Sequence, residues 1–277
     1  MEYVTLNNGV KMPLISFGVY QVKPEDTYDL VGNAIEVGYR SFDTAQRYGN
    51  EEEVGNAIKD SGIPREEFFI TTKVWITNCT EDKAYASVIE SMHKLGTDYL
   101  DLVLVHQPYN DVYACYRALE RLYKEGKVKA IGVSNFYPDR LVDIVKFNEI
   151  VPQINQIETH VYHQQRYAHE IMKEYGVQHQ AWAPFGGGRG NLLTNDTLEA
   201  IAKKYHKSIP QICLRYLIQN NINVVQKGLT IEQMKENLDL FDFMLDKDDL
   251  DKIHELDQHN SLFYSHQDPE TIEYLMR

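Results

Sequence analysis

One stretch of the chain combines a strand, a loop and a helix in that order. Residues 100–124 read LDLVLVHQPYNDVYACYRALERLYK. The apolar run Leu100–Val105 is short, as expected of a strand covered on both faces, and Val112–Lys124 has helical spacing. His106 stands directly after the apolar run. The stretch therefore predicts one unit of a parallel α/β sheet with a polar residue at its carboxyl edge.

The same alternation recurs along the rest of the chain. Further strands are expected at Leu14–Gly18, Tyr39–Asp43, Phe68–Val74, Ala130–Val133, Gln153–Gln156, Gln178–Ala181 and Ile222–Val225. Further helices are expected at Glu25–Val37, Glu51–Asp60, Glu81–Leu95, Pro138–Phe147, Gln164–Tyr175, Asp196–Tyr205, Pro210–Gln219 and Ile231–Leu240. Eight strand–helix units without a linker favour a closed (β/α)8 TIM barrel over an open, doubly wound sheet. We expect one barrel domain over residues 1–277.

The two ends of the chain add smaller elements to this barrel. Asn7-Asn8-Gly9 lies between two short apolar runs and predicts a β-hairpin that plugs the N-terminal end of the barrel. Lys247–Glu255 predicts an extra helix, and Leu256–Arg277 is a tail rich in aromatic residues.

Composition limits the class of protein. The chain has 277 residues, is 43% hydrophobic and carries a formal net charge of −13, which argues against nucleic-acid and anionic-membrane partners. No apolar run reaches the ~18 residues that span a bilayer. Residues 1–4 lack the features of a signal peptide, and the 3 cysteines have no metal-like spacing. We expect a cytoplasmic monomer or weak dimer with reduced thiols and no metal site.

Four proton-competent residues follow or close predicted strands, where TIM barrels carry their active sites. They are Asp43, Tyr48, Lys73 and His106. Tyrosine has a reference pKa of about 10, and an adjacent ammonium lowers it, so Lys73 is expected to make Tyr48 a better proton donor. Asp43 would hold the charge of the buried lysine, and a neutral His106 would donate a hydrogen bond to a carbonyl oxygen. The set predicts reduction of aldehydes or ketones.

Such a reduction needs a hydride-carrying cofactor, because no side chain delivers hydride. The usual glycine fingerprint after the first strand is absent. A glycine-rich run, Phe185–Gly190, follows the seventh strand instead, and Gln226-Lys227-Gly228 follows the eighth. Barrels often bind phosphate with these two loops. Thr230 is placed to cap the next helix, whose N-terminus favours an anion.

Several motifs in this order resemble the aldo-keto reductase superfamily over essentially the whole chain. They are Phe42–Ala45, Tyr48–Glu51, Val54-Gly55, Leu102–His106, Gly132–Phe136 and Asn155–Glu158. The tail Ser261–Phe263, with His266 and Asp268–Glu270, is similar to the bacterial branch that includes 2,5-diketogluconate reductases.

The resemblance implies NADP(H) bound without a Rossmann domain, with NAD(H) as the alternative cofactor. Ser134, Asn135 and Gln156 would hold the nicotinamide carboxamide, and Trp182 would stack on the ring where the family usually has tyrosine. Lys227 would meet the 2′-phosphate and Asn237 the adenine. The remaining cofactor contacts implied by position are Gly18, Val19, Tyr20, Asp43, Phe185, Gly186, Gly228, Thr230, Gln233 and Glu236.

Two positions depart from the family pattern. Gly228 replaces the usual serine or threonine, and Gln233 replaces the usual arginine of the following helix. Loss of a bidentate, charge-assisted contact predicts weaker NADPH binding and substantial use of NADH.

A small carbonyl substrate is expected to lie among aromatic side chains. The residues assigned to its pocket are Tyr20, Tyr48, Trp75, His106 and Tyr109, with Phe263 and Tyr264 of the tail as further walls.

Other interpretations stay open at this point. Asp43 and Lys73 could be a structural ion pair, and His106 a core histidine. A nicotinamide-binding sensor with little turnover would keep the cofactor residues. An isomerase or aldolase would use Lys73 as a Schiff base, although an adjacent carboxylate keeps the lysine charged and makes it a poor nucleophile.

Overall fold

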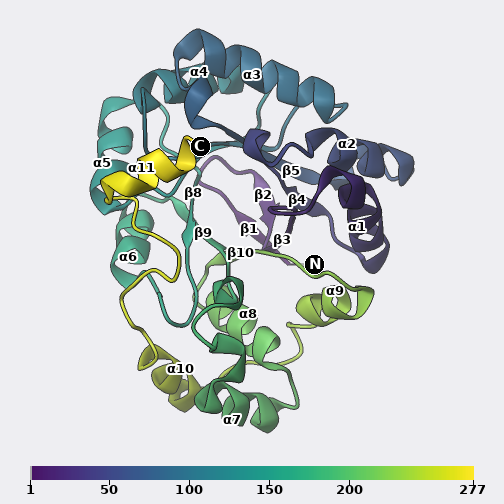
Figure 1. Ribbon diagram of the computed structural model, residues 1–277, viewed down its shortest axis with the longest axis vertical. Coiled ribbons are helices and arrows are strands. Elements are labelled where there is room, and N and C mark those ends of the chain that lie inside the picture. Colours follow the sequence, from purple (N-terminus) through teal and green to yellow (C-terminus); the bar gives the residue numbers. More distant parts are fainter. Residues whose placement is uncertain (1) are drawn as a thin grey trace.

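Parallel strands close into a barrel in the computed structural model, which describes residues 2–277 and leaves Met1 outside (Figure 1). The barrel strands are β3 (Ile15–Gly18), β4 (Ser41–Asp43), β5 (Phe69–Val74), β6 (Leu102–Val105), β7 (Ile131–Ser134), β8 (Ile154–Glu158), β9 (Gln178–Trp182) and β10 (Asn223–Gln226). Strand β10 pairs with β3, so the sheet has no open edge. The predicted (β/α)8 TIM barrel is confirmed.

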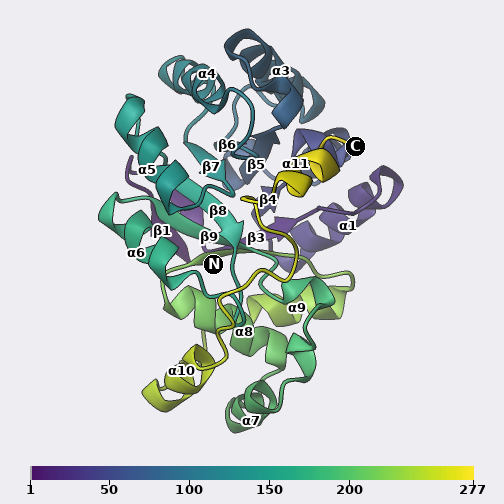
Figure 2. The same cartoon turned by 60° about the vertical axis from the view of Figure 1, so that its left-hand side comes forward.

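Helices surround the strands (Figures 1 and 2). They are α1 (Pro24–Val37), α2 (Glu51–Asp60), α3 (Glu81–Lys94), α4 (Val112–Lys124), α5 (Pro138–Phe147), α6 (Arg166–Glu174), α7 (Asp196–Tyr205), α8 (Ile209–Gln219), α9 (Ile231–Leu238), α10 (Lys247–His254) and α11 (Pro269–Leu275). None of these helices, within residues 2–277, has the length and apolar character to cross a bilayer.

Strand β5 shows how alternate side chains are divided between the barrel interior and the helices. All its residues are buried. Thr72 points outward and donates a hydrogen bond to Glu51 of α2, whereas Lys73 points inward to Asp43 of β4. A strand that is buried on both faces can thus carry one charged residue into the interior without exposing it to solvent.

The N-terminal hairpin closes the bottom of the barrel, as predicted. It consists of β1 (Tyr3–Thr5) and β2 (Lys11–Pro13), and its turn includes Gly9 with a φ of 87°. Leu6 and Met12 pack in one buried cluster with residues of the barrel strands, among them Phe69 and Leu102. This end of the barrel is therefore filled by apolar side chains, and a polar site has room only at the opposite, carboxyl end of the strands.

One helix begins later than expected, and another helix was not predicted. Helix α6 begins at Arg166 rather than Gln164, because Gln165 has a left-handed φ of 53° that cannot continue a helix. The tail contains α11, which the sequence analysis left unassigned although Asp268 and Pro269 are ordinary helix-start residues. The Asp268 side chain accepts a hydrogen bond from the N–H of Glu270.

Two helical glycines predict opposite responses to the same substitution. A Cβ on Gly32 of α1 meets nothing within 4 Å, so Gly32→Ala should stabilise the protein by about 1 kcal/mol. A Cβ on Gly55 of α2 would lie 2.6 Å from the backbone of Leu95, so Gly55→Ala should destabilise it by about 1–3 kcal/mol. Urea unfolding of the two variants measures both changes, and a shift of the same sign in both would contradict this packing.

Candidate active site

The fold brings Asp43, Tyr48, Lys73 and His106 together at the carboxyl end of the barrel. Asp43 ends β4, Lys73 is the penultimate residue of β5, and His106 follows β6. Tyr48 ends the short 3-10 helix η1 (Gln46–Tyr48) in the loop after β4. Asp43, Lys73 and His106 are buried, and Tyr48 is partly buried. The predicted grouping of these side chains is therefore present.

Lys73 contacts both Asp43 and Tyr48. Its Nζ pairs with Asp43 Oδ1 and donates to the carbonyl oxygen of Thr44 at 3.0 Å and to the Tyr48 hydroxyl oxygen at 3.4 Å. The three protons of an ammonium thus have three acceptors. Burial lowers the pKa of Lys73, and the adjacent Asp43 carboxylate opposes that shift.

The expected lowering of the Tyr48 pKa was wrong for this structure. Burial raises the pKa of Tyr48 well above its usual value, and the charge of Asp43 adds to the increase. The lysine charge is largely shared with its carboxylate partner, so the phenol experiences an ion pair rather than a free cation. Tyr48 consequently remains protonated at neutral pH and is available as a proton donor.

His106 is neutral and incompletely hydrogen-bonded. Burial, the Lys73 charge and His266 lower the pKa of His106 well below its usual value. Its ring meets Tyr48 and Trp75 edge-on, with centroids 5.7 and 5.1 Å away. Its buried Nδ1 has no hydrogen-bond partner among residues 2–277. A neutral imidazole carries one N–H, which suits a carbonyl oxygen placed beside Tyr48.

A chain of amides continues from Asp43 into the barrel. Gln156 Nε2 donates to Asp43 Oδ2 at 2.7 Å and to Gln180 Oε1 at 2.9 Å. The sequence analysis missed Gln180. The available signal was its position two residues before Trp182, which places both side chains on the same face of β9. Both oxygens of Asp43 are thus occupied by donors.

The residues assigned to the nicotinamide ring also lie together. Asn135 Nδ2 donates to the carbonyl oxygen of His106 at 3.0 Å and to Ser134 Oγ at 3.2 Å. Trp182 Nε1 donates to Asn135 Oδ1 at 2.9 Å, which fixes the indole at the end of β9. Phe263 packs edge-on against this indole with centroids 5.0 Å apart. An aromatic face and a set of amides are therefore presented side by side.

The residues assigned to the phosphate end surround the start of α9. Lys227 Nζ donates to the carbonyl oxygen of Tyr20 at 2.8 Å and has no carboxylate within 4.0 Å among residues 2–277. Thr230 caps α9 by accepting from the N–H of Gln233, as predicted. The Gln233 side chain accepts from the N–H of Leu229 at 2.8 Å and thus binds the loop that precedes α9.

Four further assigned positions lie on α9 and at the end of β3. Asn237 donates to Gln226 Oε1 at 2.6 Å, and Glu236 beside it is partly buried. Gly18 ends β3, where a Cβ would come within 2.7 Å of the Val225 side chain, and the next residue, Val19, is fully buried.

The glycine-rich loop after β9 packs against the tail. A Cβ on Gly186 would lie 2.9 Å from Leu262, and one on Gly187 would lie 2.8 Å from Phe263. Phe185 precedes this loop and packs against the hydrophobic core. Contact with the tail therefore gives Gly186 and Gly187 a structural reason separate from phosphate binding.

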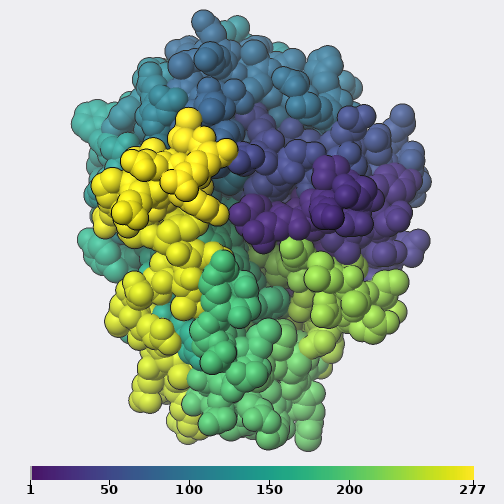
Figure 3. All heavy atoms as spheres, viewed as in Figure 1, coloured from purple at the N-terminus to yellow at the C-terminus, as the bar shows by residue number. Residues whose placement is uncertain are grey.

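The tail is fastened to the end of β8 by Glu158, which the sequence analysis did not assign a role. Its carboxylate accepts from Ser261 Oγ at 2.6 Å, from the N–H of Leu262 at 2.9 Å and from His160 Nε2 at 3.0 Å. Figure 3 shows the tail in yellow across one face of the molecule, beside the purple N-terminal part and a green segment. His160 is thus a partner of Glu158, and no three metal-binding side chains gather within residues 2–277.

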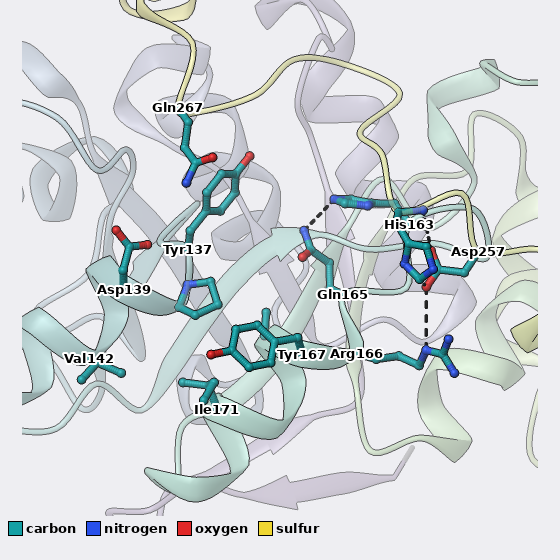
Figure 4. Close-up of a pocket in the computed structure, with 13 residues that line it drawn as sticks. Tyr137, Asp139, Val142, His163, Gln165, Arg166, Tyr167, Ile171, Asp257 and Gln267 are labelled. Carbon is teal, nitrogen blue, oxygen red and sulfur yellow. Dashed lines mark hydrogen bonds and ion pairs between the residues drawn. The ribbon is translucent and has the colours of Figure 1, made fainter.

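Aromatic residues flank Tyr48 and His106. Tyr20 lies against Tyr48 with centroids 5.0 Å apart and is 55% exposed, and Trp75 lies against His106. Tyr109 donates to the carbonyl oxygen of His266 at 2.7 Å and lines a hollow of about 130 Å³. A larger hollow of about 760 Å³ lies apart from the four residues, between α5, α6 and the tail (Figure 4).

The chain matches the model of the aldo/keto reductase family over residues 14–258. It belongs to that family and is an oxidoreductase. It is 43% identical over 263 residues to the glyoxal reductase of Bacillus subtilis (strain 168), covering 93% of each chain. An aldo-keto reductase from a Medee basin deep-sea metagenome library superposes with a TM-score of 0.93 at 44% identity, over 96% of this chain and 99% of that one. A Bombyx mori aldo-keto reductase in complex with NADP superposes with a TM-score of 0.90 at 31% identity, over 95% of both chains.

Proposed function

We propose that this protein reduces aldehydes or ketones to alcohols with NADPH or NADH, and that Tyr48 is the proton donor. The observation that carries the proposal is the contact of the Tyr48 hydroxyl with the buried Lys73–Asp43 pair, beside a neutral His106. A nicotinamide cofactor, when bound in its reduced form, would supply the hydride for the carbonyl carbon. His106 orients the carbonyl oxygen, and Tyr48 gives its proton to that oxygen as the C=O π electrons move onto it.

The raised pKa of Tyr48 agrees with this role. A phenol with a high pKa keeps its proton in the ground state and releases it to a strongly basic oxygen, such as the alkoxide-like oxygen that hydride addition creates. Lys73, at 3.4 Å, would then stabilise the phenolate left behind. The arrangement confines proton loss to the reacting state.

The chain offers suitable groups for a nicotinamide dinucleotide. Trp182 presents an aromatic face beside the amides of Asn135 and Gln156. Lys227 is a cation without a carboxylate partner within residues 2–277, at the N-terminus of α9, where a phosphate is favoured. The NADP complex of the Bombyx mori relative supports the same cofactor class. We further infer a single barrel domain that acts in a reducing compartment, which suits its buried free thiols.

The function is tested by following oxidation of NADPH and NADH against a panel of aldehydes, ketones, dicarbonyls and keto-sugars. Carbonyl-dependent oxidation is expected with at least one substrate class. Cofactor binding without turnover on the whole panel would point instead to a sensor. Trapping of a substrate on Lys73 by borohydride would point to Schiff-base chemistry, for which the three engaged contacts of Lys73 leave no free amine.

The cofactor site predicts only a modest preference for NADPH over NADH. Gly228 and Gln233 supply no charge to a 2′-phosphate, so the ratio of kcat/KM values should stay below about a thousandfold, or roughly 4 kcal/mol. Installing Gln233→Arg should raise that ratio by about tenfold or more through a charge-assisted contact. Steady-state kinetics with both cofactors gives the ratio, and a wild-type value above about a thousandfold contradicts the prediction.

A further inference from the structure

Gln46 is a partly buried residue whose side-chain amide binds two other elements of the fold. It begins η1, the short helix that carries the proposed proton donor. Its Nε2 donates to Ser87 Oγ at 3.0 Å and to Ser91 Oγ at 3.3 Å, both on α3. Its Oε1 accepts from the N–H of Trp75 at 3.0 Å and from Asn78 Nδ2 at 2.9 Å. Two donor protons and two acceptor positions are the full capacity of an amide, so all of it is used.

These four contacts fix the amide of Gln46 in one orientation. A reversed amide would turn its NH2 group toward the N–H of Trp75, which is a donor and cannot accept. Trp75 lies one residue beyond β5, so its N–H is bound by Gln46 rather than by the sheet. Asn78 ends the 3-10 helix η3 (Ile76–Asn78), and Ser91 is 1% exposed on α3. The amide is therefore attached to well-packed parts of the barrel rim.

The helix that Gln46 begins has little stability of its own. It is three residues long, its start at Ala45 has no side-chain cap, and the Tyr48 N–H donates to the Ala45 carbonyl oxygen at 3.0 Å. Single 3-10 turns have poor hydrogen-bond geometry and depend on outside contacts. Thr44 Oγ1 closes the segment by donating to Asn50 Oδ1 at 2.8 Å. Between these ends, the Gln46 amide attaches the turn to α3 and to the loop after β5.

The same amide links the backbones that carry two rings of the site. The Tyr48 and Trp75 rings both meet His106 edge-on, with centroids 5.7 and 5.1 Å away. Gln46 binds the backbone of Trp75 directly and lies two residues before Tyr48. A proton donor must lie within hydrogen-bond reach of the oxygen that it protonates, and a misplacement of about 1 Å can slow a reaction by about 10². The placement of η1 therefore has a direct effect on the rate of proton donation.

We propose that Gln46 is a positioning residue for proton donation: its amide holds η1 against α3 and the end of β5, which keeps the Tyr48 hydroxyl in reach of Lys73 and of the substrate carbonyl. This inference rests on the proposed carbonyl reduction. The four hydrogen bonds of the Gln46 side chain go to α3, Trp75 and Asn78, and none goes to Lys73 or Tyr48 within residues 2–277. Gln46 therefore acts through the placement of Tyr48.

The test is Gln46→Met, which keeps the length of the side chain and removes all four hydrogen bonds. The substrate is the carbonyl compound of the panel that the wild-type protein reduces fastest. Single-turnover oxidation of bound NADPH should slow by about 10–10²-fold, while the Kd for NADPH changes by less than about threefold. Gln46→Glu keeps the acceptor for Trp75, and the hydroxyls of Ser87 and Ser91 can turn to donate to its second oxygen. It should react at least about fivefold faster than Gln46→Met.

Two comparisons separate positioning from a general loss of stability. Gln219 on α8 is also partly buried, and its amide binds the backbone of Leu245 at 2.8 and 3.0 Å. Gln219→Met should lower the free energy of unfolding in urea and keep the wild-type rate. In a Tyr48→Phe background, Gln46→Met should slow the reaction by less than about threefold more, because the donor that it positions is already absent.

A single-turnover rate of Gln46→Met within about threefold of wild type would overturn the role of Gln46. So would an equal loss in Gln219→Met, or a further loss of about tenfold in the Tyr48→Phe background. If the methionine variant does not fold, Gln46→Asn, whose amide is one methylene shorter, takes its place with the same expected loss. The proposed function fails separately: a wild-type protein that reduces no compound of the panel refutes carbonyl reduction, whereas wild-type turnover that the Gln46 variants retain refutes only the positioning role.

Discussion

Tyr48→Phe should lower kcat by about 10²–10⁴ while the affinity for NADPH changes by less than about threefold. The substitution removes one oxygen, which Lys73 contacts at 3.4 Å, and keeps the ring that packs against Tyr20 and His106. The barrier rises because the carbonyl oxygen would develop negative charge without a proton donor in reach. Single-turnover kinetics and a binding titration separate the two quantities.

The control for this substitution is Tyr28→Phe. Tyr28 lies on the outer helix α1, and its hydroxyl donates to Asp60 of α2 at 3.0 Å, remote from the barrel mouth. It loses the same oxygen atom but should keep wild-type kcat. A Tyr48→Phe protein that turns over at a rate near that of this control would remove Tyr48 from the mechanism.

Breaking the Lys73–Asp43 pair should destabilise the fold as well as the chemistry. Lys73 is 0% and Asp43 3% exposed, so Lys73→Met leaves a buried carboxylate whose main remaining donor is Gln156. Removal of one partner of such a pair typically destabilises a protein by about 3–5 kcal/mol. Asp43→Asn should be similarly harmful because it leaves the ammonium unpaired. Urea unfolding gives both free energies.

The double variant Lys73→Met/Asp43→Asn distinguishes an ion pair from two independent residues. It should be more stable than the sum of the single effects predicts, by at least about 2 kcal/mol, because neither charge is left alone. The exposed pair Lys124–Glu149 is the comparison, and Lys124→Met should change stability by less than about 1 kcal/mol. Strict additivity in the buried cycle would show that the two charges do not depend on each other.

The barrel could be predicted because its strands are short apolar runs that alternate with helices of different period. Most element boundaries agree within one or two residues, and the late start of α6 arose at Gln165, where backbone conformation rather than hydrophobic pattern sets the boundary. Helix α11 was missed because a short helix on the surface has little periodic signal. The residues at its start, Asp268 and Pro269, are typical of a helix N-terminus and were the available signal.

The sequence predicted which residues come together in the site, but it did not predict the direction of the Tyr48 pKa shift. The positions of Asp43, Tyr48, Lys73 and His106 follow from their place after strands, which sequence order gives directly. The direction of the Tyr48 pKa depended on burial and on how fully Asp43 balances Lys73, which are three-dimensional quantities. Gln180 and Glu158 were not assigned because their partners, Gln156 and Ser261, lie far away in the chain.

Near its end, strand β8 carries two polar residues that bind different parts of the molecule. Gln156 donates to the carboxylate of Asp43, and Glu158, two residues later, accepts from Ser261 of the tail. Loss of residues 261–277 would therefore do more than open the mouth of the barrel. The Glu158 carboxylate would lose Ser261 and Leu262 and keep only His160 as a partner. Glu158 lies two residues from Gln156, which donates to Asp43, so removal of the tail should also lower kcat.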